Sequence, residues 1–121
     1  VPTHALIDAM LGAAAMGDIG KMFPDTDEAY RGISSLKLLA EAAAAIKKAG
    51  YELANADITL VMEKPKIAPF TEKMAENLAA AIGADRRLIS VKATTTERLG
   101  FTGRGEGIAA QAAVLLRAAR Q

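Results

Sequence analysis

Apolar side chains recur every three or four residues in three segments of the chain, and this spacing predicts three amphipathic helices. Thr3 is the expected N-cap of the first helix, which should end near Gly17. The second helix should begin at Ser34 or Ser35, carry lysines in its last turn and end at Gly50. The third should run from about residue 71 to residue 82, ahead of a closing glycine. The side chains expected to face inward are Leu6, Ile7, Met10 and Leu11, then Leu38, Leu39, Ala42 and Ile46, and finally Met74, Leu78 and Ala81.

Two further segments are rich in Ile, Val and Thr and predict β-strands. The first, 56–63, stops at the sequence KPKIAP, whose prolines cannot continue a sheet ladder. The second, 87–93, leads into a long polar stretch. The segment 107–118 is ambiguous, because its alanines and leucines favour a helix whereas the Gly-rich turn before it suits a returning strand. The stretch 17–32 is dense in Gly, Pro and Asp and should be loop. Alternating helices and strands predict an α/β or α+β architecture.

Length and composition restrict the class of protein. A chain of 121 residues suits one domain, which we take to span 1–121. Its 15 Lys and Arg nearly balance its 14 Asp and Glu, and only 4% of residues are aromatic, so we expect no nucleic-acid or membrane partner. No apolar run approaches the roughly 20 residues of a membrane span, and no signal peptide is expected. The lack of cysteine suits a cytoplasmic protein and leaves only nitrogen and oxygen ligands for zinc.

Three polar segments are candidates for chemistry: 17–27, 63–69 and 92–107. The last two follow the predicted strands, where sites for small molecules commonly open. The sequence ATTTE offers hydroxyls and amides for phosphate oxygens, and Glu97 offers a carboxylate suited to magnesium. The sequence EKPKIAP places Lys64 and Lys66 around a stiff turn that could surround a planar ring. A lysine-bearing surface turn and a threonine-rich strand end are the plainer interpretations, and the residues alone leave both open.

The first polar segment and the helix before it offer further candidates. His4 and Asp8 are four positions apart on one helix face and could serve one site, although a lone histidine is more often an ordinary surface residue. Asp18, Asp25 and Asp27 could hold a cation or the hydroxyls of a polyol, although acidic turns are common. Spacing alone does not decide between these interpretations.

Together, HALIDAMLGAAAMGDIGKMFPDTD, EKPKIAP and KATTTERLGFTGRGEGIAAQA resemble, in this order and spacing, the 2-C-methyl-D-erythritol 2,4-cyclodiphosphate synthases of non-mevalonate isoprenoid biosynthesis. The match runs from His4 to the C-terminus. The resemblance implies an α+β fold whose mixed sheet packs against helices on one face. It implies a homotrimer with sheets facing a three-fold axis and active sites between subunits. It also implies a strand for 107–118, against local propensity, and a plastid location if the source is a plant or an apicomplexan.

The resemblance implies a role for each polar segment. His4 matches a zinc ligand, Asp8 a residue beside that metal, and Glu97 the ligand of a magnesium or manganese ion between two phosphates. The predicted catalytic residues are therefore Asp8, Thr95 and Glu97. The predicted substrate-binding residues are Asp18, Gly20, Phe23 and Asp25 at or near the erythritol, Met62, Pro65, Lys66 and Ile67 around the cytosine, Ala93, Thr94 and Thr95 along the cytosine pocket and phosphates, and Phe101 and Arg104 near the trimer axis.

The implied reaction converts 4-diphosphocytidyl-2-C-methyl-D-erythritol 2-phosphate into the cyclic diphosphate and CMP, using zinc or another divalent transition metal and a second divalent ion. Family chains begin with roughly forty further residues, whose Asp-x-His pair makes His4 one of three expected zinc ligands. Three hypotheses remain: a metal-dependent phosphorus-oxygen lyase, a truncated non-catalytic trimer that binds CMP or an isoprenoid diphosphate, and, with the least support, an unrelated α/β interaction domain. The family commonly has histidine where this chain has Phe70, at the edge of the cytosine loop, and we expect little loss from that change.

Overall fold

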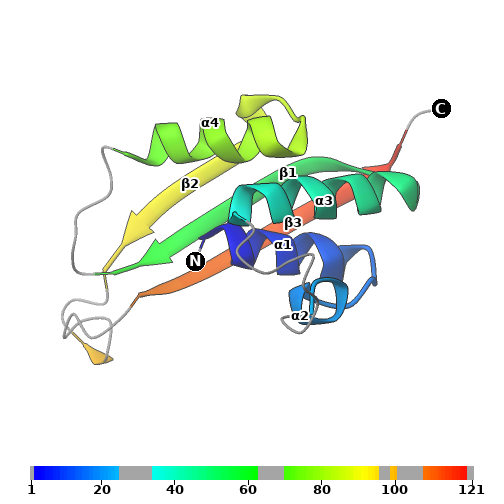
Figure 1. Cartoon of the computed structure of the whole chain (residues 1–121). Coiled ribbons are helices and arrows are strands. Elements are labelled where there is room, and N and C mark those ends of the chain that lie inside the picture. Colours follow the sequence, from blue (N-terminus) through cyan, green and yellow to red (C-terminus); the bar gives the residue numbers. More distant parts are fainter. Residues whose placement is uncertain (1, 25–33, 63–69, 96–98, 101–107, 120–121) are drawn as a thin grey trace.

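A mixed three-stranded sheet forms the centre of the computed structural model, with strand order β2-β1-β3 (Figure 1). β1 (Tyr51–Val61) runs parallel to β2 (Ile89–Thr94) and antiparallel to β3 (Ala109–Ala118). A parallel pair needs a crossover connection, and the helix between β1 and β2 supplies it. The residues that the structure describes are 2–24, 34–62, 70–95, 99–100 and 108–119.

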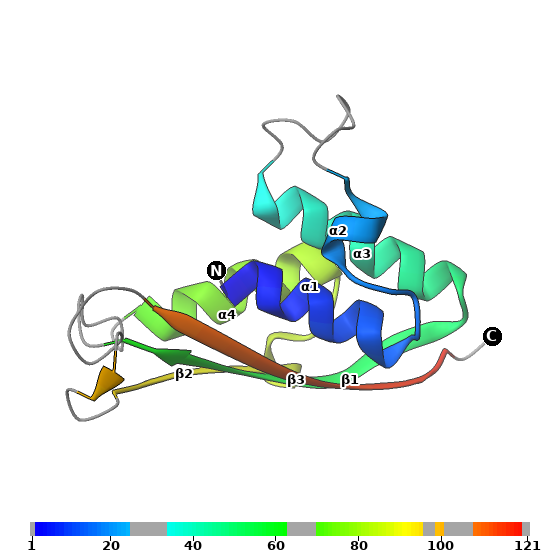
Figure 2. The same cartoon turned by 90° about the horizontal axis from the view of Figure 1, so that it is seen from below.

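The helices form a layer on one face of this sheet, as the edge-on view in Figure 2 shows. They are α1 (Pro2–Ala13), α2 (Ile19–Met22), α3 (Ser35–Lys48), α4 (Thr71–Ile82) and the short 3-10 helix η3 (Arg86–Leu88). α1 contacts β3, α4 contacts β2, and α3 packs between α1 and α4. The described helices include none long and apolar enough to cross a membrane. The fold is therefore the mixed α+β arrangement, with helices on one face, that the resemblance implies.

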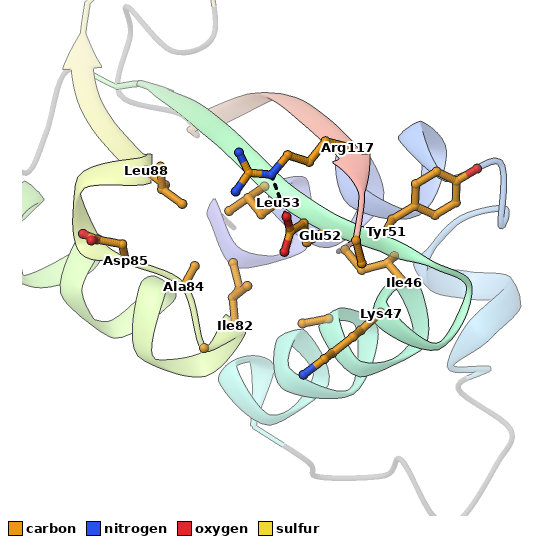
Figure 3. Close-up of a pocket in the computed structure, with 13 residues that line it drawn as sticks. Ile46, Lys47, Tyr51, Glu52, Leu53, Ile82, Ala84, Asp85, Leu88 and Arg117 are labelled. Carbon is orange, nitrogen blue, oxygen red and sulfur yellow. Dashed lines mark hydrogen bonds and ion pairs between the residues drawn. The ribbon is translucent and has the colours of Figure 1, made fainter. Parts of the chain in front are cut away.

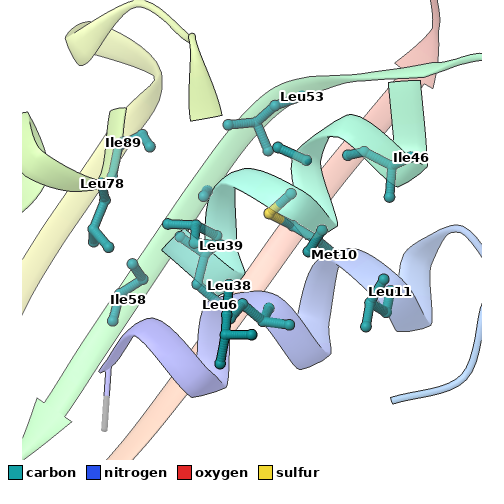
Figure 4. Packing of buried hydrophobic residues seen from close by; sticks show 14 of the residues in the cluster. Leu6, Met10, Leu11, Leu38, Leu39, Ile46, Leu53, Ile58, Leu78 and Ile89 are labelled. Atoms are coloured by element: carbon teal, nitrogen blue, oxygen red, sulfur yellow. The ribbon is translucent and has the colours of Figure 1, made fainter. Parts of the chain in front are cut away.

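The core fills the space between the helices and the sheet (Figure 4). Leu6 and Met10 of α1, Leu39 of α3 and Ile58 of β1 are all completely buried. On α4 the buried positions are Ala75, Leu78 and Ala79, so the predicted Met74 and Ala81 lie at the margin of the inward face rather than at its centre. At about 25 cal/mol per Å² of apolar surface, such burial is the main source of stability for a chain of this size.

Two helices match their predicted bounds closely. Ser34 is the N-cap of α3, and its side chain accepts a hydrogen bond from the Lys37 amide at 3.2 Å. α4 runs from residue 71 to residue 82 and closes on Gly83, whose φ of 77° lies in the left-handed region that glycine favours. Strong periodicity made both helices predictable, together with the Ser34 cap for α3 and the closing Gly83 for α4.

The prediction for the first helix was wrong at both ends. α1 begins at Pro2, and Thr3 is not a cap but a helical residue that is only 8% exposed. Proline suits the first position of a helix because its missing N–H has no partner there in any case. The helix ends at Ala13 rather than near Gly17, and Ala15 then adopts a left-handed φ of 56°. The alanines at 14 and 15 continue the helical sequence pattern past the point where α1 ends.

The stretch 17–32 is also not loop throughout its described part. Residues 19–22 form α2, a single helical turn. Asp18 is its N-cap and accepts a hydrogen bond from the Lys21 amide at 2.8 Å. The prediction from Gly and Pro content was therefore wrong for these four residues. The missed signal was Asp18, an aspartate placed to cap a helical turn through the amide three positions later.

β1 begins at Tyr51, well before the predicted start at residue 56, and a β-bulge explains the difference. Leu53 pairs with Leu116 and Asn55 with Leu115, so Ala54 is an extra residue on β1. The bulge switches which positions face the core, from Leu53 on one side of it to Ala56, Ile58 and Leu60 on the other. The alternation is broken at this point in the sequence, which concealed the first half of the strand.

The ambiguous last segment is a strand, as the resemblance predicted. β3 pairs along the whole of β1, from Tyr51 opposite Ala118 to Val61 opposite Ala109. Alternate side chains of β3 pack against the core, namely Ala112, Val114 and Leu116. Pairing with β1 therefore outweighs the helical propensity of the alanines and leucines.

Candidate active site

The carboxyl ends of β1 and β2 bring predicted site residues of both strands together. Val61 lies opposite Thr94, and the Met62 amide donates a hydrogen bond to the Thr94 carbonyl at 3.0 Å. Met62 is buried, whereas Ala93, Thr94 and Thr95 are exposed. We call these four residues the strand-end group. The parallel pairing of β1 and β2 places it where layered sheets commonly bind small molecules.

A second group of predicted residues lies on α1 and α2. His4 and Asp8 are exposed and lie four positions apart on α1. The Asp8 carboxylate Oδ1 accepts a hydrogen bond from the Ile19 amide at 2.7 Å, across a sequence separation of 11. Asp18 caps the same short helix. We call His4, Asp8, Asp18 and Gly20 the α1–α2 group.

Gly20 lies beside the Asp18 carboxylate, whereas Phe23 lies in the hydrophobic core. A Cβ added at Gly20 would lie 3.5 Å from Asp18 Oδ1, which is an ordinary contact and not a clash. Glycine therefore leaves the Asp18 carboxylate approachable, and a larger side chain would cover it. Phe23 is 7% exposed and belongs to the hydrophobic core, so its predicted role near the substrate stays a prediction.

The described residues provide only part of the predicted metal sites. His4 and Asp8 lie one helical turn apart, and an imidazole and a carboxylate oxygen are both acceptable zinc ligands. No cluster of three or more His, Cys, Asp or Glu that could hold a metal occurs within the described ranges. His4 could therefore bind a metal only together with further ligands. One carboxylate oxygen of Asp8 already accepts a hydrogen bond from the Ile19 amide.

Several predicted site residues lie outside the residues that the structure describes, and their roles stay predictions. They are Asp25, Pro65, Lys66, Ile67, Glu97, Phe101 and Arg104. Phe70, the departure from the family pattern, is described and is 61% exposed. In the α1–α2 group, Asp8 and Asp18 accept hydrogen bonds from amides of α2, whereas in the strand-end group the Met62 amide donates to the Thr94 carbonyl.

A cavity of about 480 Å³ lies at the other end of β1, near Tyr51 (Figure 3). Its lining includes apolar side chains from α3, β1 and the end of α4, such as Ile46, Leu53 and Ile82. Two charged residues in its lining, Arg117 and Glu52, form an ion pair with each other, in which Arg117 donates to Glu52 Oε1 at 2.7 Å. Of the described residues to which the resemblance gives a role, none lines this cavity.

The YgbB family model matches residues 1–117 of the chain. The chain therefore belongs to the YgbB family, and two similar bacterial proteins carry the name 2-C-methyl-D-erythritol 2,4-cyclodiphosphate synthase. The synthase of Desulfitobacterium hafniense (strain DSM 10664 / DCB-2) is 56% identical over 116 residues, which cover 96% of this chain and 73% of that protein. That of Syntrophotalea carbinolica is 58% identical over 113 residues, covering 93% of this chain and 69% of that protein.

Solved structures agree with the family match. The bifunctional IspDF of Campylobacter jejuni superposes with a TM-score of 0.91 at 44% identity, covering 96% of this chain and 31% of that one. IspF of Plasmodium falciparum in its CDP complex superposes with a TM-score of 0.84 at 31% identity, covering 98% of this chain and 70% of that one. The family resemblance in the sequence is thereby confirmed, and the fold with it.

Proposed function

We propose that the chain is the catalytic domain of a 2-C-methyl-D-erythritol 2,4-cyclodiphosphate synthase. It converts 4-diphosphocytidyl-2-C-methyl-D-erythritol 2-phosphate into 2-C-methyl-D-erythritol 2,4-cyclodiphosphate and CMP, as a phosphorus-oxygen lyase of isoprenoid biosynthesis. The observation that carries the proposal is identity of 56% over 96% of the chain to a protein of that name. The described geometry supports it, because the strand-end group offers exposed hydroxyls where a phosphate chain is expected.

The chemistry explains why such a site needs polar groups from several segments. An oxygen of the 2-phosphate attacks the diphosphate phosphorus that is bonded to the methylerythritol oxygen. The bond from that phosphorus to the oxygen between the two phosphorus atoms breaks, so that CMP leaves with this oxygen. At about 4 Å two unit negative charges repel by roughly 1 kcal/mol in water and about 4 kcal/mol at an effective dielectric of 20. Fixed amides and hydroxyls offset this repulsion and align attacker, phosphorus and leaving group.

Each group of residues has a part in that scheme. Asp18 and Gly20 receive the methylerythritol hydroxyls, and Met62 borders the cytosine. Thr94 and Thr95 donate hydrogen bonds to phosphate oxygens as their charge changes. His4 and Glu97 would each contribute a ligand to a divalent metal site, and the metals would supply Lewis-acid stabilisation of the phosphates.

One feature of the fold supports a homotrimer with sites between copies. The sheet face opposite the helices is uncovered in the view of Figure 2 and carries Leu115, which is 60% exposed. Light scattering of Leu115→Glu tests this assembly and should show fewer trimers, whereas the matched variant Leu36→Glu on the helical layer should not.

The enzymatic proposal is tested by CMP release from the diphosphocytidyl substrate in the presence of zinc and magnesium. His4→Ala and Glu97→Ala should each abolish release, and Lys73→Ala on the exposed side of α4 should leave it unchanged. The alternative is a non-catalytic trimer that binds CMP. CMP binding without turnover, lost in Glu97→Ala, would favour that alternative. If the chain neither releases CMP from the substrate nor binds CMP, both the enzymatic proposal and the alternative are wrong.

A further inference from the structure

Two carboxylates from different parts of the chain cap the single turn of α2. Asp18 Oδ1 accepts the Lys21 amide at 2.8 Å, which is the usual bond of an N-cap residue to the third amide of its helix. Asp8 Oδ1, on α1, accepts the Ile19 amide at 2.7 Å. Ile19 is the first residue of α2, and an N-cap side chain does not normally reach that amide. Asp8 therefore binds a donor that would otherwise be left to water.

A helix of four residues needs such support. The first turn of an isolated helix fixes several backbone dihedrals for one hydrogen bond and is unfavourable by itself. The bond from the Ile19 amide to Asp8 has a charged acceptor, and such bonds are shorter and roughly twice as strong as neutral ones. The geometry of α2 thus depends on a side chain outside it.

Asp8 connects α2 to a helix that is itself fixed against the core. Its helix is anchored by Leu6, Ile7, Met10 and Leu11, each of which is completely buried. On the other side of the hydrogen bond, α2 is held against the core by Phe23 and by the partly buried Ile19. The α2 turn is therefore connected to the core at its apolar side and to α1 at its first amide.

We propose that Asp8 is a positioning residue that sets the affinity for the methylerythritol end of the substrate by holding the first turn of α2. This rests on the proposed function, in which Asp18 and Gly20 receive that end. A carboxylate can accept about four hydrogen bonds, so Asp18 can cap α2 through one oxygen and meet a substrate hydroxyl with the other. Asp8 acts through the Ile19 amide. Its charge strengthens the hydrogen bond, and its oxygen is the acceptor that asparagine would keep.

Amide hydrogen exchange tests the contact without any ligand. In Asp8→Ala the Ile19 amide should exchange at least about tenfold faster than in the parent chain, because its partner is removed. In Asp8→Asn the side-chain oxygen still accepts, and exchange should rise by less than about threefold. The Leu39 amide in the core of α3 should be unchanged in both. Unchanged exchange at Ile19 in Asp8→Ala would overturn the proposal.

Titration calorimetry tests the consequence. Asp8→Ala should weaken binding of 4-diphosphocytidyl-2-C-methyl-D-erythritol 2-phosphate by about tenfold while leaving CDP within about twofold, and Asp8→Asn should restore most of the loss. Asp85→Ala, which removes the cap of η3, is the matched control and should change neither. Equal weakening of both ligands, or failure of Asp8→Asn to rescue, would overturn the positioning role. If the parent chain binds neither ligand, the proposed function is wrong, and exchange at Ile19 alone decides whether Asp8 holds α2.

Discussion

The two groups of candidate residues are held in place by different parts of the protein. In the α1–α2 group, the side chains of Asp8 and Asp18 bind backbone amides and so determine the local backbone. In the strand-end group, the backbone bond from the Met62 amide to the Thr94 carbonyl sets the geometry, and Thr94 itself is exposed. Side chains build the first group, whereas the sheet builds the second and leaves Ala93, Thr94 and Thr95 exposed.

This difference predicts how substitutions act. Removing a side chain from the α1–α2 group should alter the local fold and the chemistry together. Removing a hydroxyl from the strand-end group should alter only the chemistry, since the sheet keeps its backbone bonds. Four substitutions, taken from the largest expected effect on stability to the smallest, test this contrast.

Leu6→Ala tests whether the two groups depend on one core. Leu6 is completely buried on α1 and belongs to the cluster that also contains Ile58 of β1. Loss of its side chain should reduce the free energy of unfolding by about 2–5 kcal/mol, measured by urea denaturation. Exposed Leu36→Ala is the control and should cost much less. A single cooperative transition in Leu6→Ala would show a shared core, and separate transitions of α1 and the sheet would contradict it.

Asp18→Ala removes the cap of α2 and should reduce the free energy of unfolding by about 1 kcal/mol. Asp18→Asn keeps an acceptor oxygen and is itself a good N-cap, so it should retain most of the stability. Thermal unfolding of the two variants measures the difference. Equal stability of Asp18→Ala and the parent chain would mean that side chains do not build the α1–α2 group.

The same contrast explains what the sequence could and could not predict. The α3 and α4 helices follow from periodicity, the Ser34 cap and the closing Gly83, all of which are local signals. The strand-end group follows from two strand signals that end beside polar residues. The bond from Ile19 to Asp8 has no local signal, because its partners are 11 positions apart and meet only through packing of α1.

The remaining errors also have physical causes. The Ala54 bulge hid the first half of β1 because it shifts the alternation by one residue. The segment 107–118 has helical propensity, but its described part pairs with β1 as a strand. Only the family resemblance predicted this strand. The roles of Glu97 and of the proline-lysine turn rest on that resemblance still, since they lie outside the described residues.

Thr94→Val should change the free energy of unfolding by less than about 0.5 kcal/mol, because Thr94 is exposed and valine suits a strand. CMP release should nevertheless fall by about tenfold, equivalent to roughly 1.4 kcal/mol, as a hydroxyl donor to phosphate is lost. Ser90→Ala, at the other end of β2, is the matched control and should leave release unchanged. A loss of stability without a loss of activity would reverse the assignment of the strand-end group.

Asp85 lies in neither group and should show the smallest effect, visible only in acid. Its hydrogen bonds from Arg87 lower the pKa of its carboxyl from 3.8 to about 2. Since the folded pKa is the lower one, the contribution is fully present above about pH 4 and is lost as the pH falls through about 2. Asp85→Asn keeps the cap but not the charge, so its thermal unfolding should differ slightly from that of the parent at about pH 5, and the difference should shrink towards about pH 2. A gap that stays constant over this range would mean that the exposed Asp85–Arg87 pair contributes nothing through its charge.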